Sequence, residues 1–467
     1  MEFIEKIVHF DWQRQAPKFI ILGVLAAAAI LGLFVSKQLA ILAVAGVGGT
    51  VLFFWLTRRI EWGVLALIPI SYLVKTELGT GTESALNASI LWVILLIGVW
   101  FARMVVIDRR LRLAPGRVNL PAILFLVVIA LAFIAGNVQW LPFANARASI
   151  FAQAGGASML GLPVATMLLA ANVLREERWL RWITWSFLGL GAVYLVAIWF
   201  PAWSVLTNLF NIKAVSALFF IWCTALSGGM LLFNKEMRGW QRWAMSGMLA
   251  LTLAVGIFLM RTSASSWVPA LVALAVLCVL KWWRVGVLLG MAGGVVALSR
   301  ISDLYLRFFG IEQYSAVTRA ATWPIMWELV QASPLLGLGP SNYYYYTPLY
   351  SLMGYYVQFN SHNNYWDLAA QVGLLGLGVF IWMVASLTWT GWKLRRQVTT
   401  GFQSGFVNAA LAGLAGTLVS GLLADWFMPF VYNIGFEGFR GAVFAWMFLG
   451  GLVAVERFVA VGQKADL

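Results

Sequence analysis

Charged residues are scarce in this sequence. Only 11% of its 467 residues are Asp, Glu, Lys or Arg, whereas 62% are hydrophobic. A water-soluble fold of this length would need far more polar surface. Apolar runs of about twenty residues recur from end to end, each long enough to cross a hydrocarbon core of roughly 30 Å as a helix, whereas transmembrane β-strands would alternate polar and apolar residues. The sequence predicts an all-α polytopic membrane protein with about 12–14 transmembrane helices.

Cysteine and histidine are also rare, with two residues of each. The two cysteines, Cys223 and Cys278, both lie in apolar runs, which gives no disulfide or metal signal. There is no Asp-x-Asp motif, histidine pair or cysteine cluster, so we expect no metal site and no cofactor. A Walker loop, a Rossmann glycine pattern and an internal repeat are absent too, so neither ATP-driven transport nor an inverted-repeat transporter gains support.

Most of the 32 lysines and arginines fall in alternate connections between the apolar runs. By the positive-inside rule these connections are cytoplasmic, as are both termini. The net charge of +14 is then a topology signal, and no nucleic-acid partner is expected. The first apolar run, residues 19–35, lacks a clear cleavage site, so we interpret it as a retained span. The basic connections are the N-terminus, Arg58-Arg59, 103–117, 175–181, 235–242, 281–284, 393–396 and the C-terminal tail.

One long polar and aromatic loop, residues 299–364, is expected on the extracytoplasmic side of a single membrane domain that comprises residues 1–467. Within it, Trp323, Trp327 and Val330 share one helical face, which is typical of a short helix lying on the membrane. A run of four tyrosines follows, and its rings suit either stacking on sugar rings or plain interfacial packing. From this run, Tyr343 and Tyr344 are candidate glycan contacts.

His362, near the end of this loop, is the only side chain assigned to the outer face with an unperturbed pKa near neutrality. It could therefore accept a proton from a hydroxyl, as a general base must, and Asp367 could orient it. Asn363 beside it is a candidate substrate contact. The alternative is that His362 only hydrogen-bonds within the loop and caps the next helix.

Cationic residues at the outer ends of the apolar runs form a second group of candidates. A buried and unpaired guanidinium is costly in a membrane, so such residues often mark an anionic ligand or a carboxylate partner. For each one alone, a lipid headgroup contact or a distant salt bridge is the alternative. As a set near one histidine they favour a phosphate site, and its candidates are Arg147, Lys213, Arg261, Arg300, Arg307, Arg319 and Arg440.

Three motifs follow one another in and just beyond this loop. They are Arg319-x-x-x-Trp323, then Pro334-Leu-Leu-Gly337-Leu-Gly339-Pro340, then His362-Asn363 followed after nine residues by Gly373-x-x-Gly376. This arrangement resembles the bacterial superfamily of O-antigen ligases and O-antigen polymerases. The resemblance covers about residues 315–380, and the many-span layout agrees over the whole chain. Members of this family are C-type glycosyltransferase-like membrane enzymes that need neither a metal nor a nucleotide sugar.

The resemblance implies roles for three residues. His362 would be the general base that activates the acceptor hydroxyl, Arg319 would hold the departing pyrophosphate, and Arg261 would correspond to the family's other arginine near the outer end of a span. The implied reaction is a metal-independent, inverting transfer on the periplasmic face of the bacterial inner membrane. The implied partners are an undecaprenyl-pyrophosphate-linked glycan donor, a glycan or lipid A core acceptor, membrane lipids and other polysaccharide-assembly proteins.

Two other classes of function compete with this enzyme. A transporter or flippase of lipid-linked or anionic glycans would carry ionisable residues deep within spans, or helices broken at symmetric positions. The charges gather instead at span ends and in one loop, which favours an enzyme. A non-catalytic scaffold would have no use for such a loop. The sequence does not separate a ligase from a polymerase, because loop shape selects the acceptor.

Overall fold

The structure, a computed structural model, describes residues 37–79, 85–138, 140–141, 147–260, 263–299 and 313–465, and most of them are helical. The longer helices of the first half are α3 (Lys37–Arg58), α4 (Ile60–Leu73), α5 (Ala88–Ala102), α6 (Asn119–Ala135), α7 (Ile150–Val173), α8 (Glu177–Trp199) and α9 (Ala217–Phe233). Those of the second half are α10 (Gly239–Ala254), α11 (Ala264–Lys281), α12 (Trp283–Ser299), α14 (Gln313–Ala332), α16 (Asn364–Gln397), α17 (Gly401–Leu423) and α18 (Phe439–Ala465).

Short elements join these helices. Two three-residue strands, β1 (Glu77–Gly79) and β2 (Ala85–Asn87), pair antiparallel between α4 and α5. The four-residue helix α15 (Tyr343–Tyr346) and the 3₁₀ turn η5 (Thr347–Leu349) lie between α14 and α16. Further short 3₁₀ or π-helical segments are η1 (Arg103–Ile107), η2 (Pro201–Leu209), η3 (Ile212–Ala214), η4 (Val255–Leu259) and η6 (Phe436–Gly438).

The expected all-α polytopic membrane fold is confirmed. Among the described residues, seven helices are long and apolar enough to cross a membrane, and four shorter apolar helices accompany them. Each of them lies in an apolar run of the sequence. The seven begin at Ala88, Ile150, Glu177, Gly239, Asn364, Gly401 and Phe436.

The chain divides into two compact units, and the division falls within α4 and α5. The first contains the described residues 37–63 and 98–111, and the second contains residues 64–97 and the chain from residue 112 onward. All site residues discussed below belong to the second unit. The predicted single domain over residues 1–467 stays a prediction.

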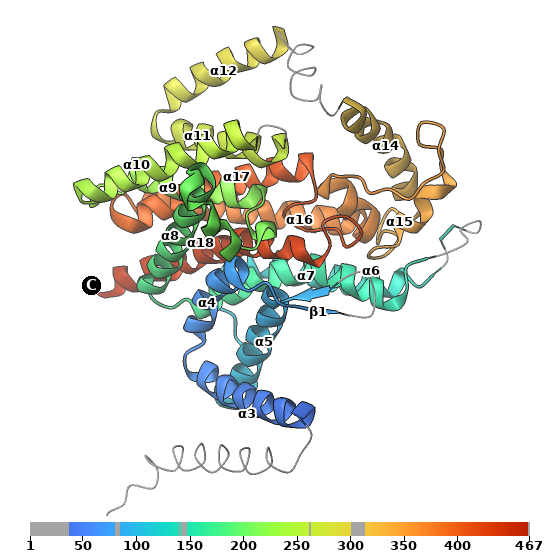
Figure 1. Ribbon diagram of the computed structural model, residues 1–467, viewed down its shortest axis with the longest axis horizontal. Helices are drawn as coiled ribbons and strands as arrows, with labels where there is room; N and C mark the ends of the chain where they lie inside the picture. The colour runs from blue at the N-terminus through green and yellow to red at the C-terminus, as the bar shows by residue number, and fades with distance from the viewer. Residues whose placement is uncertain are drawn as a thin grey trace, which may run out of the picture. The chain divides into compact units, whose positions relative to one another are not determined.

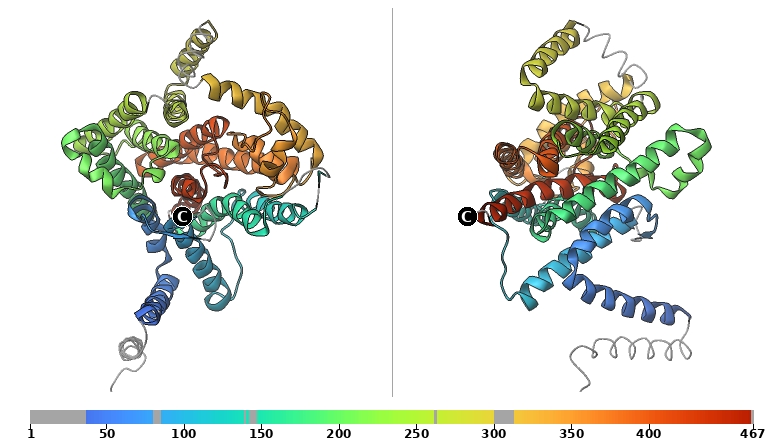
Figure 2. Two further views of the ribbon diagram at one scale, coloured as in Figure 1. Left: turned by 45° about the vertical axis from the view of Figure 1, so that its right-hand side comes forward. Right: turned by 90° about the vertical axis from the view of Figure 1, so that its left-hand side faces the viewer.

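In the second unit, α16, α17 and α18 pack against one another and form its centre. Helices α9 and α11 pack on α17, while α7 packs on α18 and α6 on α16 (Figure 1). The left view of Figure 2 shows the same central helices between α8–α11 and α6–α7. Because α16 and α17 are joined by only a short turn, they run antiparallel, and the start of α16 lies at the same end of the bundle as the end of α17.

Several of the basic connections meet at the other end of this bundle. Lys281 donates to the carbonyl of Leu232 at 2.9 Å, and Arg457 donates to that of Leu174 at 2.7 Å. Gln403 donates to Glu177 at 2.5 Å, which joins the first turns of α17 and α8. One end of the second unit therefore gathers the connections that charge assigns to one side of the membrane.

The predicted short helix around Trp323, Trp327 and Val330 is longer than expected, since α14 spans residues 313–332. Trp323 and Trp327 are exposed, but Val330, predicted to share their face, is buried. The helix packs into a hydrophobic cluster through Ile325, Met326, Leu329 and Val330. It is thus anchored to the bundle by its aliphatic side.

The two glycine-containing motifs of the loop pack against each other. The N–H of Leu374 donates to Pro334 at 2.7 Å, and that of Leu338 donates to Ala370 at 2.8 Å. Gly373 interrupts α16 with non-helical dihedrals (φ 73°, ψ 179°), which exposes backbone groups for these bonds. The segment 334–340 is thereby attached to the first turns of α16, directly beyond His362.

Candidate functional site

His362 lies immediately before α16 with its backbone in the left-handed region, at a φ of 49°. Its neighbours fix this conformation. The Ser361 hydroxyl donates to Asp367 Oδ1 at 2.7 Å, and Asn363 Oδ1 accepts the N–H of Tyr365 at 2.9 Å. Asn363 therefore caps α16, where the alternative above assigned the cap to His362. Since both neighbours are bonded, the position of the imidazole is defined by the fold.

The predicted partnership between Asp367 and His362 is wrong. Oδ1 of Asp367 accepts the hydroxyl of Tyr343 at 2.5 Å as well as that of Ser361. Tyr343 is fully buried and stacks on Phe430 with ring centroids 4.8 Å apart. Burial, together with the Asp367 carboxylate, raises the pKa of Tyr343 well above its usual value. Tyr343 thus anchors the loop internally, in place of the glycan contact expected of it.

The imidazole instead faces a side chain that follows it by 71 residues. Nδ1 of His362 lies 3.4 Å from Nδ2 of Asn433. The same amide nitrogen donates to Asp425 Oδ1 at 2.6 Å, while Oδ2 of that carboxylate accepts the N–H of Phe430 at 2.9 Å. Asn433 therefore connects a buried carboxylate to the histidine ring.

Sequence reasoning missed Asp425 and Asn433. The signal for Asp425 was a lone carboxylate directly after the apolar run 402–424, before the irregular stretch that leads to α18. Asn433 carried no local signal, because an asparagine in a turn-rich segment is ordinary.

Burial shifts the two titratable groups toward their neutral forms. It lowers the pKa of His362 to about 4, and the nearby positive charge of Arg319 acts in the same direction. It raises the pKa of Asp425 to about 6, against the hydrogen bonds from Phe430 and Asn433. At neutral pH the imidazole is uncharged and can accept a proton.

Arg319 reaches this group from α14. Its Nη1 donates to the carbonyl of Leu423, at the end of α17, at 2.9 Å. Its buried Nε has no hydrogen-bond partner among the described residues. A buried donor without an acceptor is unfavourable, so this N–H is suited to an anionic ligand. Its charge acts on both His362 and Asp425, which brings one predicted arginine and the predicted histidine together.

The remaining described candidates lie elsewhere. Arg147 is exposed and donates to the carbonyl of Asn137. Tyr344 is half-buried and stacks on Tyr432 with centroids 4.6 Å apart, so part of this ring pair stays accessible beside Asn433. Arg261, Arg300 and Arg307 lie outside the described residues.

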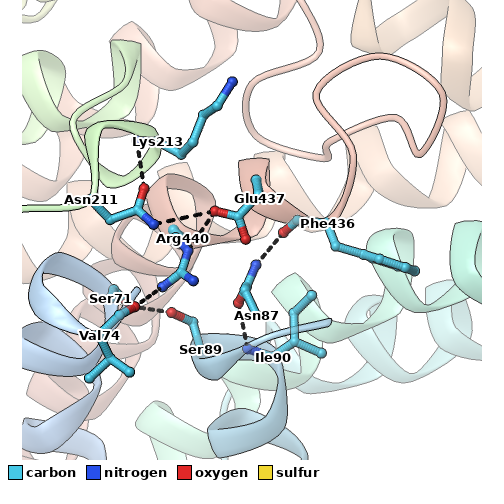
Figure 3. A network of polar contacts seen from close by, with 10 residues as sticks. All are labelled: Ser71, Val74, Asn87, Ser89, Ile90, Asn211, Lys213, Phe436, Glu437 and Arg440. Carbon is cyan, nitrogen blue, oxygen red and sulfur yellow. Dashed lines mark hydrogen bonds and ion pairs between the residues drawn. The ribbon is translucent and has the colours of Figure 1, made fainter. Parts of the chain in front are cut away.

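Arg440 belongs to an internal network, drawn in Figure 3. It is fully buried, its Nε donates to Glu437 at 2.7 Å and its Nη1 to the carbonyl of Val74 at 2.6 Å. Lys213 is exposed, and its side chain extends away from this pair (Figure 3). The structure thus gives Arg440 a structural role in place of the substrate contact predicted for it.

Comparison with known families supports the loop motifs. Residues 241–381 match the family described as O-antigen ligase, and the match includes Arg319, the 334–340 motif and His362. This match supports the resemblance to the superfamily of O-antigen ligases and polymerases. It also supports glycan transfer of the O-antigen ligase type in general. No curated protein matches the chain.

Proposed function

We propose that this protein, like an O-antigen ligase, transfers a glycan from undecaprenyl pyrophosphate to a sugar hydroxyl, without a metal, on the extracytoplasmic face of a bacterial inner membrane. The observation that carries the proposal is that an uncharged imidazole, His362, lies near a half-buried guanidinium, Arg319, whose buried Nε has an N–H to offer. One group can accept a proton and the other can bind an anion. Glycosyl transfer from a pyrophosphate needs both.

Arg319 acts on the leaving group. As the bond between the anomeric carbon and the pyrophosphate oxygen breaks, negative charge grows on the pyrophosphate. A guanidinium already fixed by the Leu423 carbonyl stabilises that charge without reorganising, which lowers the barrier more than a mobile cation would. The polyprenyl tail of the donor stays among the lipids beside the bundle.

His362 acts on the acceptor. The acceptor oxygen forms the new bond to the anomeric carbon while its proton passes to the imidazole. Attack on the face opposite to the departing pyrophosphate inverts the anomeric configuration. Because Nδ1 faces Asn433, Nε2 is the nitrogen available to the acceptor.

We assign to Asn433 the selection of the tautomer of the His362 imidazole. Nε2 can accept a proton only when the ring hydrogen is on Nδ1, and that hydrogen then needs an acceptor. In the structure the Asn433 NH₂ nitrogen faces both Nδ1 and the Asp425 carboxylate. Rotation of the amide that turned its carbonyl oxygen toward Nδ1 would hold the ring in the tautomer that the reaction needs.

Purified protein supplied with a lipid-linked oligosaccharide and two acceptors tests the proposal. One acceptor is a second lipid-linked glycan and the other a lipid A core oligosaccharide. Lengthened lipid-linked chains identify a polymerase, and glycan on the core identifies a ligase. His362→Ala should abolish both products while thermal unfolding stays cooperative. Full activity of His362→Ala would show that His362 is not the base. If the wild-type protein forms neither product, the proposed function is wrong.

A further inference from the structure

A second polar pocket lies at the end of the bundle remote from His362. Its volume is about 270 Å³, and its lining includes Arg181, Asn234, Glu236, Arg238 and Phe402. Phe402 is in the first turn of α17, whose other end at Leu423 meets Arg319. A helix of 23 residues spans about 34 Å, so this pocket and the proposed active site are separated by about the thickness of a membrane.

Two arginines supply the positive charge of the pocket. Arg181 lies over the Phe402 ring at 5.2 Å, and its Nε donates to Glu177 at 2.5 Å. This bond leaves the terminal nitrogens of its guanidinium without a partner among the described residues. Arg238, at the N-cap position of α10, is exposed and has no carboxylate partner among the described residues. Both guanidiniums can therefore bind an anion.

Glu236, the one acid among these lining residues, is held against another element. A Cβ atom added to Gly401 would lie 2.9 Å from both of its carboxylate oxygens. The carboxylate therefore sits beside the N-terminus of α17, where the partial positive charge of the helix stabilises it. With that charge offset locally, the pocket keeps the positive character of its arginines.

Asn234 adds a buried donor at the edge of the pocket. Its side chain is 6% exposed, and its Oδ1 accepts the N–H of Glu236 at 3.2 Å. Its Nδ2 reaches only the Met230 sulfur, at 4.0 Å, among the described residues. An amide N–H this poorly satisfied favours a further acceptor, such as a phosphate oxygen.

The surrounding tryptophans indicate the depth of the pocket. Trp185 lines it, and Trp240 and Trp243, on the first turns of α10, are exposed. Tryptophan prefers the level of the lipid headgroups, where its ring contacts both acyl chains and water. Basic pockets between helices at this level bind anionic headgroups.

We propose that this pocket binds the phosphate of an anionic phospholipid headgroup in the leaflet at the basic end of the bundle. The two arginines and the Asn234 amide contact the phosphate oxygens, and Trp185 and Phe402 contact the adjoining apolar part of the lipid. This site is independent of the glycan-transfer proposal, since no residue is shared.

The test uses delipidated full-length protein in detergent, titrated with phosphatidylglycerol, cardiolipin or phosphatidylethanolamine and followed by native mass spectrometry and thermal unfolding. Arg238→Gln should weaken binding of the two anionic lipids about fivefold, and Arg181→Gln combined with Arg238→Gln should weaken it further. The control is Arg178→Gln. Arg178 is an exposed arginine at the start of α8, near Arg181 but outside the pocket, so its substitution should leave the affinity for the anionic lipids unchanged. Because Arg238 has no carboxylate partner there, its variant should fold normally.

Equal affinity of Arg238→Gln and Arg178→Gln for the anionic lipids would overturn the proposal. So would equal binding of phosphatidylethanolamine. The same unfolding measurement is made with inorganic phosphate at millimolar concentration in place of lipid. If phosphate stabilises the protein as much as the lipids do, the pocket binds a soluble phosphate compound and the lipid proposal is wrong. Glycan transfer is measured on the same samples and should persist in Arg238→Gln, so that failure of one proposal is distinguished from failure of the other.

Discussion

Gly337 and Gly373 approach so closely that a Cβ atom added to either would lie 2.6 Å from the backbone nitrogen of the other. Both adopt positive φ, near 71° and 73°. No residue with a side chain fits this crossing without strain. The two glycine motifs of the sequence are therefore the two halves of one backbone contact, which fixes the loop onto α16 immediately beyond His362.

Gly373→Ala should unfold or strongly destabilise this region, since the added methyl would meet the Leu335 carbonyl oxygen at 2.1 Å. The expected loss is about 3 kcal/mol or more, from strained φ and overlap together. The matched control is Gly378→Ala on the same helix, where a Cβ meets nothing within 4 Å. The control should be neutral or slightly stabilising, because alanine favours helix. Thermal unfolding in detergent measures both, and equal melting temperatures would contradict the argument.

Local patterns predicted the helices well and the loop contacts poorly. Apolar runs such as 402–424 are predictable because burial of one continuous segment depends only on that segment. The 334–340 motif was recognised from the sequence, but its attachment to α16 is a tertiary contact that the local sequence does not specify.

The candidate site divides in the same way. His362 and Arg319 were identifiable because each is an unusual residue in its segment. Asp425 and Asn433 were not, because their importance comes from α17 and the turn after it being folded against the start of α16. Tyr343 and Arg440 were predicted as substrate contacts because of their polar groups, but in the fold these groups are buried and bond to Asp367 and Glu437.

Arg440→Leu should lower stability rather than substrate affinity. Removing the arginine leaves Glu437 with an uncompensated charge, at about 3 kcal/mol for a largely buried pair. Adding Glu437→Gln should recover part of this loss. Arg178→Leu, which breaks the exposed pair with Glu176, should change stability by less than about 1 kcal/mol. Melting temperatures report these effects; a normal melting temperature with a raised KM would restore Arg440 as a substrate contact.

Arg319→Gln should reduce kcat/KM for glycan transfer by about a hundredfold or more, because a fixed cation at the leaving group is lost. Arg319→Lys should recover only part of the rate, since an ammonium keeps the charge but not the planar N–H groups that bind both Leu423 and an anion. Steady-state transfer assays compare the two variants with Arg178→Gln. Indistinguishable rates for all three would exclude Arg319 from the reaction.

Substitutions of Asn433 should change the pH profile of transfer. The reaction needs neutral His362, so the wild-type rate falls as pH drops through the His362 pKa of about 4. Arg319 is the charged neighbour there, because Asp425, with its pKa raised to about 6, is already neutral. Asn433→Asp places a carboxylate against Nδ1, which favours the imidazolium and raises that pKa. The acid limb of kcat/KM should move upward toward neutrality.

Asn433→Ala separates orientation from charge. It removes the bridge without adding a carboxylate, so kcat should fall while the acid limb stays far below neutrality. Asp425→Asn should abolish any inflection near pH 6, where the Asp425 carboxyl titrates. Profiles from about pH 3 to 9, on protein shown to be folded at each pH, measure all three variants. If the acid limb of Asn433→Asp coincides with that of Asn433→Ala, Asn433 does not act through the imidazole, and its contact with His362 serves only to pack the loop.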